Sequence, residues 1–230
     1  SLAGSLSYNK IRNNTQAKVR NGSKISAAGT VKIGATDASS ITADAGGFAL
    51  AIAASADGNA VGVAVGAALA INDIGVDLQA DVEDSQVLNA SGLDVTASSH
   101  STIDALSLVG SAAVAVSGNG AEGYAGAGAI SVNTIADTTQ AQLSASQVAL
   151  SSGAVTVSAS DTSRINADSG GAALAVAASP AGLGSLGIAL GAGLSINNIG
   201  NDVSASIDNS TVTSKAGVSV EATSAAGIRA

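Results

Sequence analysis

The chain lacks the residues with which proteins usually build cross-links and large cores. It has no cysteine, methionine or tryptophan, one proline, one phenylalanine and two tyrosines. Without cysteine, disulfides and thiol chemistry are excluded, and the compartment cannot be read from cysteine usage. Aromatic side chains normally bury about 150–250 Å² each. The core must therefore form from many small contacts between closely approaching backbones.

Charge is sparse and unevenly distributed. The net charge is −8, yet residues 1–36 carry basic side chains and no acid, whereas residues 72–99 carry acids and no base. Complementary charges on neighbouring units would set their register; the alternative is two solvated faces. An acidic chain without aromatic platforms argues against nucleic-acid partners. The basic residues are Lys10, Arg12, Lys18, Arg20, Lys24 and Lys32, and the acids are Asp73, Asp77, Asp81, Glu83, Asp84 and Asp94.

Long hydrophobic runs are also missing. The longest, Ala60–Ile71, is shorter than the roughly 20 apolar residues of a membrane-spanning helix. We therefore expect no membrane insertion.

What the chain does have is repetition. Asn9, Asn72, Asn133 and Asn197 each lie two residues before an isoleucine, at steps of 61 to 64 residues. A fixed long period predicts a repeat architecture in which each unit buries its face against its neighbours. We expect one continuous array over 1–230, with units 8–70, 71–131, 132–195 and a partial 196–230. Because both ends fall inside a unit, we expect a segment of a longer protein or a unit that continues end to end with other copies.

Each unit divides into two halves of about 31 residues. The glycine- and alanine-rich halves are 41–70, 103–131 and 165–195, and their apolar residues alternate as in strands. Val63, Val65 and Leu69 share one face, which we expect to be buried. The parity of the large residues switches at 46–47 and 170–171, which predicts a bulge or corner. Turns are expected at 55–59, 117–120 and 179–184.

This pattern predicts an all-β fold, a repetitive parallel β-solenoid or β-helix with ~62-residue repeats. Two arrangements remain open. In the favoured one, each half is a full coil of its own. In the other, the glycine- and alanine-rich half projects as a hairpin from a coil formed by the second half.

The residue pattern resembles a known class of proteins. Ala141–Ala159, followed by Ile165 and residues 167–171, and the matching copy at Ala17–Ala35, are similar to repeats of giant secreted bacterial surface proteins of the haemagglutinin and adhesin type. The resemblance covers nearly the whole chain and contains no catalytic motif. It implies export, an extracellular or cell-surface location, and a role in adhesion, biofilm or filament formation.

Two sets of side chains are candidates for sites. In stacked coils the four asparagines would form a hydrogen-bonded ladder, a structural column of Asn9, Asn72, Asn133 and Asn197. Calcium, which binds several oxygens at one point, is the ion that best suits the acidic segment. Its candidate ligands are Asp73, Asp77, Asp81 and Asp84, although no known calcium-loop spacing is present. We expect no other cofactor.

Catalysis has little support. His100 is the single histidine, and no spacing suggests a Ser-His-Asp site. The glycines of 118–123 precede a second strand instead of a helix, so we interpret them as a turn. We therefore expect no enzyme. A carbohydrate-active β-helix enzyme with paired carboxylates remains a remote alternative.

The alternating small residues suggest an association face. Such faces let sheets approach closely and, if exposed, self-associate. We expect the face to comprise Ala125, Ala127, Ala129, Gly187, Ala189 and Gly191. The overall expectation is a structural extracellular protein forming a filament, stalk or matrix fibre, whose partners are further repeats or other copies, end to end or laterally. The alternative is a calcium-stiffened adhesin that binds a surface glycan or ice.

Overall fold

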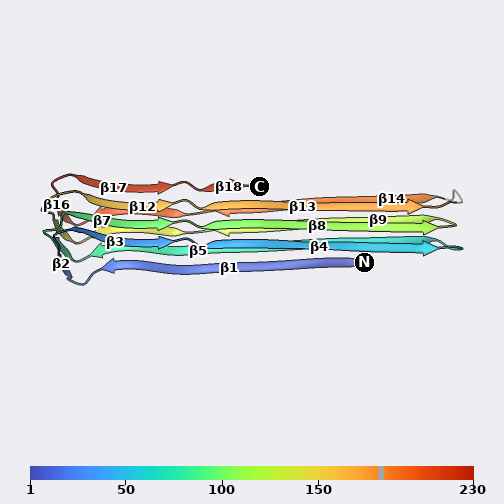
Figure 1. Cartoon of the computed structure of the whole chain (residues 1–230), viewed down its shortest axis with the longest axis horizontal. Helices are drawn as coiled ribbons and strands as arrows, with labels where there is room; N and C mark the ends of the chain where they lie inside the picture. Colours follow the sequence, from blue (N-terminus) through green and yellow to red (C-terminus); the bar gives the residue numbers. More distant parts are fainter. Residues whose placement is uncertain (181–183) are drawn as a thin grey trace.

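The chain forms four stacked layers of parallel strands. The computed structural model describes residues 1–180 and 184–230 and contains only strands as regular elements there. Each layer runs out along one long path and back along another, and the layers lie one above the next (Figure 1). The fold is therefore all-β with parallel strands in stacked sheets, as in a β-solenoid. The first two layers contain β1 (Leu2–Val19), β2 (Lys24–Ser26), β3 (Thr30–Asp37), β4 (Ser40–Ser55), β5 (Ala60–Glu83), β6 (Gln86–Leu88), β7 (Gly92–Ser99) and β8 (Thr102–Ser117).

The third and fourth layers divide the long outward path into two strands. They contain β9 (Ala121–Ile135), β10 (Thr138–Ser144), β11 (Gln147–Ala149), β12 (Val155–Asp161), β13 (Arg164–Ala178), β14 (Ser185–Ile199), β15 (Asp202–Asp208), β16 (Thr211–Thr213), β17 (Val218–Ser224) and β18 (Gly227–Arg229). The turns expected at 55–59 and 117–120 lie between strands, as predicted. The turn expected at 179–184 includes residues 181–183, which lie outside the described residues.

Strand pairing shows which residues lie above one another. The first sheet has the order β14-β9-β5-β10-β15, with β1 also pairing β5, and the β4 sheet has the order β18-β13-β8-β4. Two further sheets join β17-β12-β7-β3 and β16-β11-β6-β2. All these pairs are parallel. The expectation that each half of a unit is a coil of its own is therefore wrong, because hydrogen-bonded neighbours belong to different units and the two halves share a layer.

The molecule has a body and a wing. In the body, the end of Figure 1 that carries β2 and β16, the first sheet faces the β3 sheet and large aliphatic side chains fill the interior. Ile74, Ile135 and Leu78 are completely buried there, as are Ile103 and Ile165. Columns of one residue type stack through the layers, such as Ile11, Ile74, Ile135 and Ile199.

The wing is formed by residues 1–8, 45–70, 107–131 and the described part of 169–195. Here the first sheet packs directly on the β4 sheet, and the interior consists mainly of alanine and glycine, with buried serines and Val109. A Cβ placed on Gly66 would lie 2.5 Å from Val109 Cγ1 and 2.9 Å from the Gly110 carbonyl oxygen. The two sheets therefore meet almost backbone to backbone, which only small residues permit.

The parity switch in the sequence has a different cause from the one we expected. β4 runs through Gly46 and Gly47 without interruption, and residues 41, 43, 45 and 49 all face inward. No bulge forms. The large residues change sides instead, from inward Ile41 in the body to outward Phe48 and Leu50 in the wing. The switch thus marks the border between the two kinds of interior.

Candidate association surface

The four asparagines lie in one column at the border of body and wing. Asn9 Nδ2 donates to Asn72 Oδ1 at 2.9 Å, Asn72 Nδ2 to Asn133 Oδ1 at 2.7 Å, and Asn133 Nδ2 to Asn197 Oδ1 at 2.8 Å. Asn72 and Asn133 are 1% and 0% exposed. The amides thus form a chain of hydrogen bonds, all donated in the same direction, from the first layer to the fourth.

The acidic candidates for calcium do not converge. Asp73, Asp77 and Asp81 follow one another along β5 at intervals of four residues, or about 13 Å in an extended strand. Asp73 pairs with Lys10 and Arg12, and Asp81 pairs with Lys18 at 3.1 Å. Asp77 accepts hydrogen bonds from Asn14 and Gln79.

Asp84 occupies a corner after β5, with a φ of 44°. No group of three or more histidine, cysteine or acidic side chains able to hold a metal occurs in 1–180 or 184–230. The ion pairs do follow the charge contrast between the first two units, including Lys32 with Asp94 at 4.0 Å. The acids of the second unit therefore meet the bases of the first.

The expected association face points inward, toward the second sheet of the wing. Ala125, Ala127 and Ala129 are 5%, 6% and 1% exposed, because they pack between the two sheets of the wing. Gly187 and Gly191 point the same way, since a Cβ on either would approach β13. Ala189 alternates in step with them along β14 and has Ala125 as its neighbour in β9. The small-residue face is the inward side of the wing. Ala125, Ala127 and Ala129 are therefore not available to a partner, whereas Gly187, Ala189 and Gly191 are exposed because they lie in the last layer.

The large aliphatic residues of the wing are exposed instead. Val63 and Val65, which we expected to be buried, are 46% and 42% exposed, and Leu69 lies on the same outward side. Val65 pairs with Leu2 of the first layer and with Gly126 of the third, so its exposure is not an end effect; Val63 pairs with Tyr124 of the third layer. The opposite face, on the β4 sheet, also carries exposed large hydrophobic residues, including Phe48, Ile52 and Leu108.

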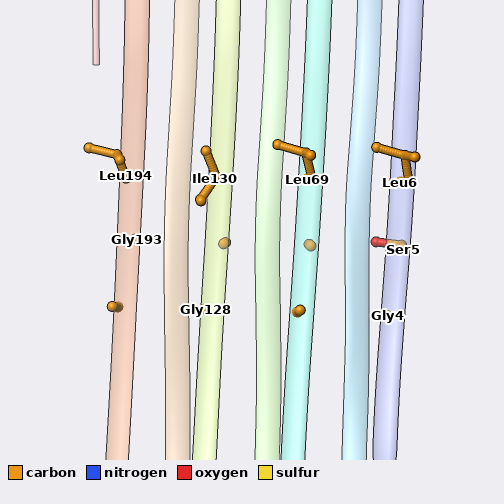
Figure 2. A pocket seen from close by; sticks show the side chains of 12 residues that line it. Gly4, Ser5, Leu6, Leu69, Gly128, Ile130, Gly193 and Leu194 are labelled. Carbon is orange, nitrogen blue, oxygen red and sulfur yellow. The ribbon is translucent and has the colours of Figure 1, made fainter.

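One outward face is grooved. Leu6, Leu69, Ile130 and Leu194 form an aliphatic row that crosses β1, β5, β9 and β14 in register. Figure 2 shows their side chains side by side across the strands. Two residues earlier on each strand lies a small-residue row, Gly4, Ala67, Gly128 and Ala192, which lines a hollow of about 710 Å³ with the aliphatic row.

A second feature, which we did not expect from the sequence, is a group of buried polar side chains inside the body. We call this group, which contains Asp137, Asp161, Ser99 and Ser101, the polar seam. Asp137 Oδ1 accepts the Val76 N–H at 3.0 Å, and Asp137 Oδ2 accepts the hydroxyls of Ser101 at 2.6 Å and Ser99 at 3.0 Å. Asp137 is 1% exposed and Asp161 is 0% exposed. Burial raises the pKa of the Asp137 carboxyl, its hydrogen bonds oppose this, and the nearby Asp161 charge adds to the rise.

His100 lies outside any such cluster. Its Nδ1 atom is 2.7 Å from Thr162 Oγ1 at an exposed corner of neighbouring layers. The glycines at 118–120 form the turn before β9, where Ser117 Oγ accepts the Asn119 and Gly120 N–H groups.

Comparison with protein-family models, with curated proteins and with solved structures gives no match. In the part of the chain that the structure describes, no helix could cross a membrane.

Proposed function

We propose that this chain is a structural module, a section of an extracellular β-solenoid built from repeats of about 62 residues that serves as a stalk or matrix fibre at a cell surface. The observation that carries the proposal is the unbroken register between layers. β1 pairs β5 over the whole of Leu2–Val19, and β5 pairs β9 over Ala60–Ile74. Each layer is thus a template for the next.

The stacking is reinforced by like-on-like columns. Amide ladders of the kind formed by Asn72 and Asn133 stabilise stacked strands because each amide both donates and accepts. Aliphatic columns such as Ile74 on Ile135 bury apolar surface at every layer. A rod of this kind gains stability with each added layer, as expected for a load-bearing element.

The edges of the stack support extension. β1 pairs on one side with β5, and β14 pairs on one side with β9. The outer edges of β1 and β14 can each accept a further parallel strand, from additional repeats of the same chain or from another copy. The location outside the cell rests on the resemblance to secreted surface proteins.

Electron cryo-microscopy of the purified protein, with and without a calcium chelator, tests this proposal. We expect rods with a layer spacing of about 4.8 Å along the axis, unchanged by the chelator. Particles that lose their order when calcium is removed would instead favour the calcium-stiffened adhesin.

A further inference from the structure

The outer face of the first sheet in the wing is apolar over all four layers. From Glu122 near the tip to the row of Lys10 and Asp73 at the border, the described residues on this face carry no charge. Leu186, Ile188 and Leu190 of β14 are 47%, 50% and 71% exposed. Such a contiguous face is typical of a surface that a partner covers.

The relief of this face is regular. The aliphatic row forms a ridge, and the small-residue row beside it forms a trough parallel to the ridge (Figure 2). A Cβ placed on Gly128 or on Gly126 would meet no atom within 4 Å. The trough is therefore open and unfilled by the chain's own side chains.

We propose that this face binds the same face of a second copy, with the two stacking axes parallel and the ridge of each copy in the trough of the other. Ridge and trough lie two residues apart on every strand, about 7 Å in extended backbone. A two-fold axis parallel to the stack and midway between them exchanges the two rows. One patch thus serves both subunits, as in an isologous dimer.

Layer spacing favours a second copy over an unrelated partner. Two stacks of the same chain share one spacing, so a contact made at Leu69 recurs in phase at Leu6, Ile130 and Leu194. Face-to-face sheets pack about 10 Å apart with interdigitating side chains. The matching period lets the ridge enter the trough along its whole length.

The available area is sufficient. Four strands about 4.8 Å apart and about ten residues long at 3.3 Å each give roughly 600 Å² per copy, or about 1,200 Å² for the pair. Specific interfaces begin at about this size. Further repeats would enlarge the contact in proportion.

A lipid surface fits the face less well. In the described wing residues, 1–8, 45–70, 107–131, 169–180 and 184–195, no lysine or arginine is present to meet anionic headgroups, and the chain's net charge is −8. Polybasic segments are what normally attach proteins to such membranes.

Lateral pairing of two copies rests on the proposed structural role, but its test does not depend on that role. Sedimentation velocity of the purified chain over a concentration series should show a reversible dimer. Gly128→Leu places a side chain in the trough at a position where a Cβ meets no atom of the monomer within 4 Å, and we expect it to weaken the dimer at least about tenfold. Gly227→Leu is the matched control, because a Cβ there also meets no atom within 4 Å and the residue lies in β18, outside the first sheet. The control should dimerise like the parent.

Circular dichroism and thermal melting establish that both variants are folded. Ile130→Ser shortens the ridge at a residue that is 41% exposed, so it opens no buried cavity and should also weaken the dimer. A parent chain that stays monomeric overturns the proposal, as does a dimer that Gly128→Leu and Gly227→Leu leave equally intact. A monomer that floats with phosphatidylcholine vesicles overturns it in favour of lipid. None of these results bears on axial stacking, which cryo-microscopy reports separately.

Discussion

Gly66 of β5 lies against Val109 of β8 so closely that the glycine has no room for a Cβ, which would come within 2.5 Å of the valine Cγ1 atom. This contact sets the spacing of the two wing sheets. It also explains why Val65, the large residue next to Gly66, points outward: apart from Val109, the described interior of the wing is filled by small side chains.

Filling this contact should open the wing. Gly66→Val is expected to lower the free energy of unfolding by about 1–3 kcal/mol, since an added side chain must push the sheets apart. Gly227→Val adds the same group where no atom lies within 4 Å, and we expect a change within about 0.5 kcal/mol. Urea unfolding of both variants measures the difference. Equal stabilities would mean that the sheets do not touch at Gly66.

Breaking the asparagine column should cost more than breaking an exposed hydrogen bond of the same kind. Asn72→Ala removes the acceptor of Asn9 and the donor to Asn133 at a site that is 1% exposed. We expect a loss of about 1–3 kcal/mol, the cost of leaving buried polar groups unsatisfied.

The matched control is Asn166→Ala. Asn166 Nδ2 donates to Asp104 Oδ1 of the neighbouring layer at 2.8 Å, but in an exposed position. Its loss should change stability by less than about 1 kcal/mol. If both variants lose the same stability in thermal or urea unfolding, the buried column has no special role.

The polar seam predicts a pH dependence. Because burial raises the folded-state pKa of Asp137 above the value of about 3.9 in an unfolded chain, its contribution to stability is most favourable below that value and is lost as pH rises through the raised pKa. Asp137→Asn keeps an acceptor for the Val76 N–H without the charge. We expect the variant to gain stability relative to the parent as pH rises from below 4 toward neutrality.

Urea unfolding of parent and variant at a series of pH values measures the effect of Asp137 together with its coupling to Asp161, since the groups that do not interact with Asp137 cancel in the difference. The groups around the carboxyl are Ser99, Ser101, Ser163, Asp161 and the Val76 N–H. A difference that is constant across the series would show that Asp137 titrates normally.

The ion pairs between the first two layers should contribute little. Lys18 and Asp81 are the least exposed of these pairs, at 24% and 14% of the side chain. Asp81→Asn is expected to cost less than about 1 kcal/mol, and the loss should shrink at high salt because exposed charges are screened. A larger, salt-independent loss would indicate a buried pair instead of a surface pair.

The stacking was predictable from the sequence and the orientation of the wing was not. The recurrence of Asn72 at Asn133, and of Ile103 at Ile165, places these residues in columns once layers stack. The usual assumption that large aliphatic residues face inward places Val63 inside and Ala64 outside, whereas the structure has the reverse. The sequence did contain a signal for this orientation. The even-numbered residues of 60–70 are all glycine or alanine, which suits the inner face of two closely packed sheets.

The polar seam could not be anticipated in the same way. Asp137 and Asp161 are separated in sequence by β10, β11 and most of β12, and they come near each other only when these strands close the body. No fixed spacing links two such residues. The calcium expectation was drawn from local density along 73–84, which an extended strand spreads out instead of gathering.

The outward orientation of the large wing residues is tested most directly by thiol labelling of cysteines introduced at two adjacent positions, because the chain has no cysteine of its own. Ala49 is 1% exposed and Leu50 is 48% exposed, and both lie in β4, away from the proposed dimer face. The structure predicts that Leu50→Cys reacts rapidly with a water-soluble thiol reagent in the folded protein, whereas Ala49→Cys reacts only after unfolding. Rapid labelling of Ala49→Cys together with protection of Leu50→Cys would contradict the account and return the aliphatic residues to the interior.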